Sequence, residues 1–87
     1  MKLTELEQKF MTAVPKDDFY EQGFESVLWS DVFFDAAEID PKVGRGVLSS
    51  LIQKGFIEGG VDAFSLDEKG VEWMKANFEL DEEGYEL

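Results

Sequence analysis

Apolar and polar residues follow two periods along this chain, one typical of helices and one typical of short strands. A helical period starts at Thr4, which stands three residues before Glu7 in the spacing of a capping box, and it stops at Pro15. We therefore predict a first helix over residues 4–14 and a loop over residues 15–24. The positions expected to face the core are Leu3, Leu6, Phe10, Ala13 and Val14.

A second helical pattern covers residues 25–39, where apolar side chains surround the helix except along one acidic row. The row contains Asp31, Asp35 and Glu38, whose i, i+4, i+7 spacing places the three carboxylates on one face. We expect Leu28 and Phe34 to flank this row and the opposite face to be buried. The expected core positions are Trp29, Val32, Phe33, Ala36 and Ala37.

Residues 41–54 give the clearest helix signal in the chain. Asp40 is a good N-cap, Pro41 suits the first helical position, and Gly55 supplies a left-handed residue at the end. One half of the helix is apolar and contains Val43, Gly44, Val47, Leu48, Leu51 and Ile52. The other half is polar and contains Lys42, Arg45, Gly46, Ser49, Ser50 and Gln53.

Two glycines interrupt this helix, and each costs up to ~1 kcal/mol of helix stability relative to Ala. Gly44 lies in the apolar half, where we expect it to permit close packing of a neighbouring helix. Gly46 lies in the polar half and has no such explanation. The difference favours a polar face that contacts another molecule.

Short apolar runs at residues 56–58 and 63–66, separated by the turn-forming residues 59–62, predict a tight β-hairpin. A last helix is predicted to begin at Asp67, or at Ser65 with Glu68 in a capping-box spacing, and to end near residue 78. We assign Trp73 to its core side, with a dimer contact as the alternative. Residues 79–87 contain five acidic side chains and are predicted to form a solvated tail.

The pattern as a whole predicts an α+β fold that is mostly helical, with three helices, a hairpin and a fourth helix in that order. One domain is expected over residues 1–78, followed by a flexible acidic tail over residues 79–87. With 87 residues, 44% of them apolar and eight of them Phe, the chain has enough apolar side chains for one small core.

The residue types that are missing restrict the chemistry. The absence of Cys excludes disulfides, thiolate metal sites and thiol nucleophiles, and it favours a cytoplasmic location. There is also no His and no glycine-rich phosphate loop, so we predict no catalytic activity, no cofactor and no metal site. The first ten residues lack the pattern of a secretory signal, and no run approaches the ~20 apolar residues of a membrane span.

The net charge of −12 is unevenly distributed. Residues 40–60 carry three basic side chains against two acidic ones, whereas residues 16–39 and 61–87 are strongly acidic. The helix over residues 41–54 therefore lies in the basic part of an acidic protein, and its polar face is a candidate for recognition.

The order of these elements, with the runs AEIDPKVGRGVLSSLIQKGFI and SLDEKG, resembles the winged helix-turn-helix family of small regulators in bacteria and phages. The resemblance covers residues 4–78. It implies transcription regulation, with residues 41–54 as a recognition helix whose N-terminal half enters the major groove of DNA. The implied contact residues are Lys42, Arg45, Gly46, Ser49, Gln53 and Lys54.

The acidic composition supports a second hypothesis. Residues 57–66 contain no Lys or Arg, and Lys42, Arg45 and Lys54 together neutralise at most ~3 phosphates, so DNA binding would be weak or need a dimer or partner. Alternatively, the acidic helix binds a basic protein or mimics DNA, because carboxylates four residues apart rise ~6 Å along a helix. A merely solvated face also remains open. The residues of this alternative surface are Asp31, Phe34, Asp35 and Glu38.

Overall fold

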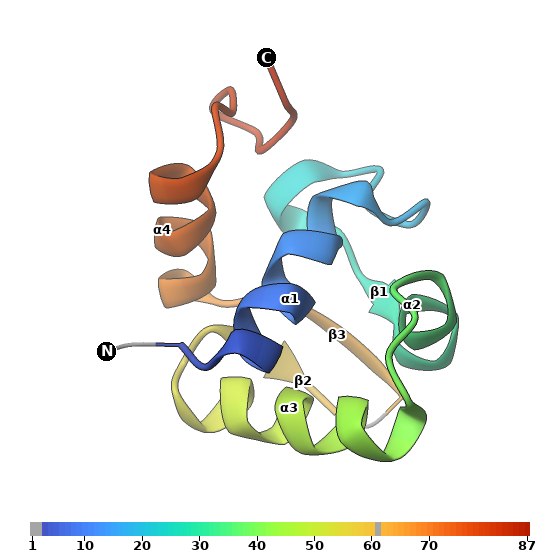
Figure 1. The fold of residues 1–87 in the computed structure, drawn as a ribbon. Helices are drawn as coiled ribbons and strands as arrows, with labels where there is room; N and C mark the ends of the chain where they lie inside the picture. The colour runs from blue at the N-terminus through green and yellow to red at the C-terminus, as the bar shows by residue number, and fades with distance from the viewer. Residues whose placement is uncertain (1–2, 61) are drawn as a thin grey trace.

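In the computed structural model, which describes residues 3–60 and 62–87, the chain forms four α-helices and a three-stranded antiparallel sheet (Figure 1). The predicted α+β composition and the order of the helices are confirmed. Residues 1–2 of the predicted domain, and Val61 in the predicted hairpin turn, lie outside the described residues. The elements are α1 (Glu5–Ala13), the 3₁₀ turns η1 (Val14–Lys16) and η2 (Gly23–Glu25), β1 (Leu28–Trp29), α2 (Ser30–Ala36), α3 (Pro41–Gln53), β2 (Ile57–Gly59), β3 (Ala63–Leu66) and α4 (Glu68–Asn77).

Local capping chemistry fixes the helix termini where the sequence predicts them. The Thr4 hydroxyl accepts a hydrogen bond from the Glu7 amide at 3.1 Å, and the Glu7 carboxylate accepts one from the Thr4 amide at 2.8 Å. The Asp40 carboxylate accepts a hydrogen bond from the Lys42 amide at 2.9 Å at the start of α3. Gly55, with φ of 82°, ends the same helix in the left-handed conformation.

The predicted hairpin is present, but the sheet contains one more strand than expected. Strands β2 and β3 pair with Ile57 opposite Leu66, and β1 pairs with the other edge of β3, so the strand order is β1-β3-β2. The prediction of one helix over residues 25–39 is therefore wrong at its N-terminal end. Residues 28–29 are extended because Leu28 and Trp29 pair with β3, and the Ser30 amide donates to the Asp62 carbonyl at 2.9 Å.

The strand changes which side chains of this segment are buried. Leu28, expected beside the acidic row, is fully buried, whereas Trp29 and Val32, expected in the core, are about half exposed. Ala36 is also exposed, while Phe33 is buried as predicted and Ala37 is partly so. The change follows from the strand, since neighbouring residues in extended backbone point to opposite sides.

The acidic row is also shorter than predicted. Helix α2 ends at Ala36, and Glu38 lies beyond it with φ of 58°, in the left-handed region. Only Asp31 and Asp35 are therefore helical neighbours at i, i+4, and both are exposed. Glu38 does not continue their face, because its backbone no longer follows the helical rise.

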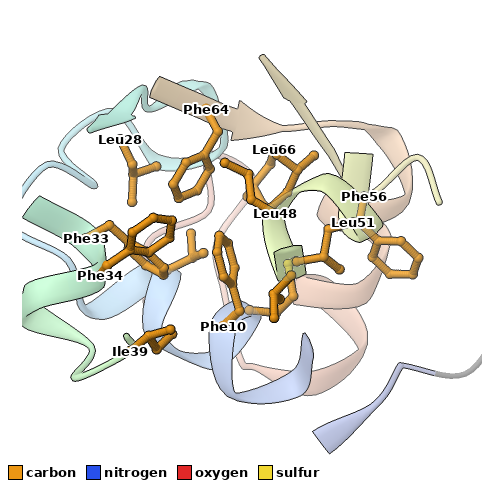
Figure 2. Packing of buried hydrophobic residues seen from close by; sticks show 14 of the residues in the cluster. Phe10, Leu28, Phe33, Phe34, Ile39, Leu48, Leu51, Phe56, Phe64 and Leu66 are labelled. Carbon is orange, nitrogen blue, oxygen red and sulfur yellow. The ribbon is translucent and has the colours of Figure 1, made fainter. Parts of the chain in front are cut away.

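Four phenylalanine rings meet in the core, and they belong to Phe10 of α1, Phe33 and Phe34 of α2 and Phe64 of β3. Phe10 of α1 points into the cluster between α2, α3 and the sheet (Figure 2), and its ring centroid lies 4.6 Å from that of Phe33 and 5.2 Å from that of Phe64. Phe33 and Phe64 are 5.2 Å apart in an edge-to-face arrangement. Aromatic side chains bury the largest apolar area per residue, so this cluster joins the helices to the sheet.

Residues 79–87, predicted to form a solvated acidic tail, fold back onto the domain. Leu80 and Glu86 form an antiparallel bridge, and the segment returns to η2 near the C-terminus (Figure 1). The Phe24 amide donates to the Glu83 carbonyl and the Tyr20 hydroxyl to the Gly84 carbonyl, both at 2.8 Å. Burial, with negative charge nearby, raises the pKa of Tyr20 to about 12, so its hydroxyl remains a hydrogen-bond donor.

The two glycines of α3 should respond oppositely to substitution by Ala. A Cβ at position 44 would lie 2.7 Å from atoms of the buried Phe34 ring, whereas a Cβ at position 46 would meet nothing within 4 Å. We expect Gly44→Ala to lower the free energy of unfolding by roughly 1–2 kcal/mol, because overpacking outweighs the gain in helix propensity. Gly46→Ala should raise it by about 1 kcal/mol.

Urea unfolding at low micromolar protein concentration measures both changes. The two substitutions add the same methyl group to one helix, so each serves as the control for the other. A stabilising Gly44→Ala would contradict the packing of Phe34 against α3.

Candidate functional site

The outer face of α3 presents the polar residues that the sequence predicts there. The side chains on this face are exposed, and Gly46 lies open among them. Within the described residues, neither Lys42 nor Arg45 takes part in an ion pair. The predicted contact residues exposed on this face are Lys42, Arg45, Gly46, Ser49 and Gln53.

Lys54, the sixth predicted contact residue, is instead bound to the domain. Its ammonium group lies 2.6 and 2.8 Å from the two carboxylate oxygens of Glu7, and the Ser50 hydroxyl donates to the same carboxylate at 2.7 Å. The charge of Lys54 is therefore neutralised within the fold. Lys42 and Arg45 are the cations that α3 presents to solvent.

The partner of Lys54 is the buried carboxylate of Glu7 on α1. The hydrophobic pattern did not predict that this side chain would be buried. Glu7 is only 2% exposed, while Leu6, predicted to pack in the core, is 51% exposed. Glu7 belongs to the capping box of α1 and also faces α3, where it contacts Ser50 and Lys54. Sequence reasoning finds the capping role of Glu7, but the contact with Lys54 spans 47 residues and has no local signal.

The electrostatics of Glu7 follow from these contacts. Burial by itself raises the pKa of a carboxyl group, but hydrogen bonds from Lys54, Thr4 and Ser50 and the charge of Lys54 outweigh it. Together they lower the pKa of Glu7 from 4.5 to about 2. The carboxylate is thus ionised at neutral pH and holds α1 against α3.

A second surface combines exposed apolar side chains with carboxylates at the junction of β1 and α2. Trp29 is 52% exposed, and Val27 and Val32 are similarly exposed. Val27 and Trp29 stand on either side of the buried Leu28, and Val32 lies in the first turn of α2 directly after β1. We call this the Trp29 surface, defined as Val27, Trp29, Asp31, Val32 and Asp35.

Phe34, proposed from the sequence as an apolar anchor beside the acidic row, is not part of this surface. It is 1% exposed and packs against Gly44 of α3. A buried ring cannot contact a partner, so Phe34 is corrected to a core residue. A strand assignment for residues 28–29 would have pointed Trp29 outward and identified the exposed aromatic residue instead.

A third feature is a shallow hollow of about 270 Å³ between the start of α1 and the first half of α3. Leu6 on α1 and Val43 on α3 are exposed at its sides, and Gly46 and Val47 also line it. Val43 was predicted in the apolar half of α3 and remains 43% exposed because no described segment covers it. We call this hollow the α1–α3 depression.

Across residues 3–60 and 62–87, no group of three or more Asp, Glu, His or Cys side chains is arranged to hold a metal ion. Among the helices of these residues, none is both long enough and apolar enough to span a bilayer. Comparisons of the chain with protein-family models, with curated proteins and with solved structures found no match.

The buried Glu7 should make stability depend on acid pH. Its pKa is about 2 in the folded state and 4.5 ordinarily, so the stability it contributes is full above pH 4.5 and is lost as pH falls towards 2. The shift corresponds to at most about 3.4 kcal/mol at neutral pH, and solvent screening reduces this contribution. Urea unfolding between pH 2 and 7 measures this effect. In the Glu7→Gln variant, the part of the pH dependence of the unfolding free energy that Glu7 causes should be mostly lost.

Glu5→Gln is the matched control, because Glu5 lies on the same helix and is exposed. It should leave the acid dependence of unfolding close to that of the original chain. Equal acid dependence in the Glu7→Gln variant and the original chain would show that the Glu7 to Lys54 contact is not formed in solution.

Proposed function

We propose that this chain is a non-enzymatic module of the winged-helix kind that binds a basic protein segment through the Trp29 surface. Helices α1, α2 and α3 followed by the β2–β3 hairpin and α4 stand in the order that the resemblance implies, which supports this fold assignment. The observation that carries the functional proposal is the exposed Trp29 immediately before α2, the helix that holds the exposed Asp31 and Asp35.

An exposed tryptophan suits a binding contact. Trp, with Tyr and Arg, is enriched among the few side chains that dominate binding energy at protein interfaces. Trp29 exposes half of its surface between Val27 and Val32, which extend the apolar area around it. An apolar centre with a polar rim is the arrangement of a protein-binding surface.

The charge of the surface determines the chemistry of the partner. Asp31 and Asp35 of the Trp29 surface are exposed, and neither takes part in an ion pair within the described residues. A net charge of −12 attracts basic partners over distance and repels acidic ones. The partner that fits best is a segment with Lys or Arg beside apolar residues, and a DNA-binding protein that normally contacts phosphates has this chemistry.

Titration with a synthetic peptide of alternating Lys and Leu tests the proposal, with Trp29 fluorescence as the signal in a Trp73→Phe background. We expect saturable binding and a blue shift of the Trp29 emission as the indole leaves water. Trp29→Ser should weaken binding at least tenfold, measured by calorimetry. Ser is also a favourable N-cap for α2, so this variant should fold.

The charge dependence has a matched control. Asp31→Asn with Asp35→Asn should weaken peptide binding, whereas Glu72→Gln with Glu79→Gln changes the net charge equally at exposed positions on and after α4 and should have little effect. Equal losses in the two double variants would mean that only net charge matters, and the proposed surface would then be rejected.

DNA binding through α3 is the second candidate function. It is favoured by the exposure of Lys42, Arg45 and Ser49 on one helical face, with Gly46 leaving room for close approach. Since Glu7 neutralises Lys54, the helix itself offers two cations to DNA. A plot of the logarithm of the binding constant against the logarithm of the salt concentration should therefore have a slope of about −2. Such binding is weak without a second copy or a partner.

Titration of a generic duplex at two salt concentrations measures this slope. Lys42→Ala with Arg45→Ala should abolish duplex binding, while Lys69→Ala with Lys75→Ala removes the same charge from α4 and should leave most of it. No binding at ~50 mM salt, where phosphate contacts are strong, would eliminate this candidate.

A further inference from the structure

Residues 79–87, which we call the C-terminal segment, have internal hydrogen bonds of their own. The Asp81 carboxylate accepts hydrogen bonds from the amides of residues 83–85, at 2.9, 2.9 and 3.0 Å. The antiparallel bridge between Leu80 and Glu86 closes the turn. Because these bonds lie within the segment, it can leave the rest of the domain as one unit without losing them.

The segment packs on the η2 loop, defined as residues 20–25, through two close approaches of glycine (Figure 1). Gly23, with φ of 59°, lies against the Glu83 carbonyl, whose oxygen would be 1.8 Å from a Cβ at that position. Gly84, with φ of 100°, lies against Phe24, and a Cβ there would be 2.7 Å from the ring. Both glycines are therefore required by the docking of the segment on the loop.

Backbone groups also supply the polar contacts between the two. In addition to the hydrogen bonds from Phe24 and Tyr20, the Tyr85 hydroxyl donates to the Glu21 carbonyl. Each of these bonds ends on a main-chain carbonyl, and within the described residues no ion pair joins the segment to the loop. The docking thus rests on backbone geometry and not on attraction between charges.

The carboxylates of the two parts oppose this docking. A hollow of about 530 Å³ between them is lined by Glu25 of the loop and by Glu82 and Glu83 of the segment. Like charges from both sides therefore meet around one hollow. Their repulsion is smaller when the segment leaves the loop.

The cations at this end of the fold offset only part of the repulsion. The Lys75 ammonium lies 5.7 Å from the centroid of the Phe24 ring, and Lys16 lines a neighbouring hollow together with Glu86. Neither lysine takes part in an ion pair within the described residues. The carboxylates that line the two hollows outnumber these cations, so the local charge remains negative.

We propose that the C-terminal segment is a latch whose closing is controlled by ionic strength. The glycine contacts and backbone hydrogen bonds close the latch, while the repulsion between carboxylates opens it and is screened by salt. Opening uncovers the Phe24 ring and the Tyr20 hydroxyl, which Gly84 contacts in the closed state. The proposal does not involve the Trp29 surface and is independent of the function assigned there.

Amide hydrogen exchange measured by NMR reports the latch at single residues. The Phe24 amide bonds to the Glu83 carbonyl only when the segment is docked, whereas the Phe56 amide bonds to the Leu51 carbonyl and reports on the core. We expect the protection of Phe24 to be roughly tenfold or more below that of Phe56, because local opening needs less free energy than global unfolding. Equal protection of the two amides would mean that the segment opens only when the domain unfolds, and would overturn the proposal.

Gly84→Ala should open the latch, because the added Cβ meets Phe24 and the φ of this position disfavours Ala. We expect the protection of the Phe24 amide to fall at least tenfold, while that of the Phe56 amide stays within about twofold. Gly46→Ala adds the same methyl group at an open position of α3 and should leave Phe24 unchanged. Equal losses at both amides in Gly84→Ala, or no loss at either, would contradict the proposal.

The salt dependence tests the charge part of the latch at constant pH. Raising NaCl from roughly 20 to roughly 500 mM should increase the protection of Phe24 several-fold more than that of the core amide. Glu25→Gln with Glu82→Gln removes charge from both sides of the hollow and should remove most of this excess. Glu58→Gln with Glu72→Gln removes the same charge at exposed positions that do not line the hollow, and should leave the excess in place.

Two results would show that charge does not control the latch. One is a Phe24 protection that changes with salt no more than the core amide does. The other is an equal salt effect in the two double variants. Either result overturns the proposal even if Gly84→Ala opens the segment.

Discussion

The arrangement of the helices depends on one buried carboxylate. Glu7 accepts a hydrogen bond from the Thr4 amide at the start of α1, and it also binds Ser50 of α3 and Lys54 at the end of α3. A single side chain therefore caps one helix and holds a second helix against it. Removing one member of a buried ion pair leaves an uncompensated charge, which is more costly than never having the pair. The orientation of α3, and with it every residue on its outer face, is thus linked to α1.

The same contact explains why the functional surfaces lie where they do. When Glu7 faces α3, Leu6 is turned outward beside Val43, and the α1–α3 depression results. Gly44 leaves room for the Phe34 ring, so α2 packs closely on α3, while the pairing of β1 with β3 leaves Trp29 exposed. Exposed apolar residues here follow from how the helices are held and are not a failure of core formation.

The sequence predicted those elements whose ends are set by residues close together in the chain. Asp40, Pro41 and Gly55 define α3 within one residue at its C-terminal end, and the hairpin follows from two apolar runs around a turn. The sequence did not predict features that depend on contacts between segments far apart in the chain. Strand β1 forms only because β3 is beside it, and Lys54 is occupied because α1 brings Glu7 to it. The exposed face of α3 was therefore predictable, but the loss of Lys54 and the exposure of Trp29 were not.

The folded C-terminal segment alters how the charge of this protein acts. Hydrogen bonds from Phe24 and Tyr20 hold residues 83–84 in place, so the carboxylates of this segment extend from a fixed backbone. The segment lies at the opposite end of the molecule from α3, with its two unpaired cations (Figure 1). The carboxylates of the C-terminal segment and the two cations of α3 are therefore held at opposite ends of the fold, so a charged partner meets a different local potential at each end.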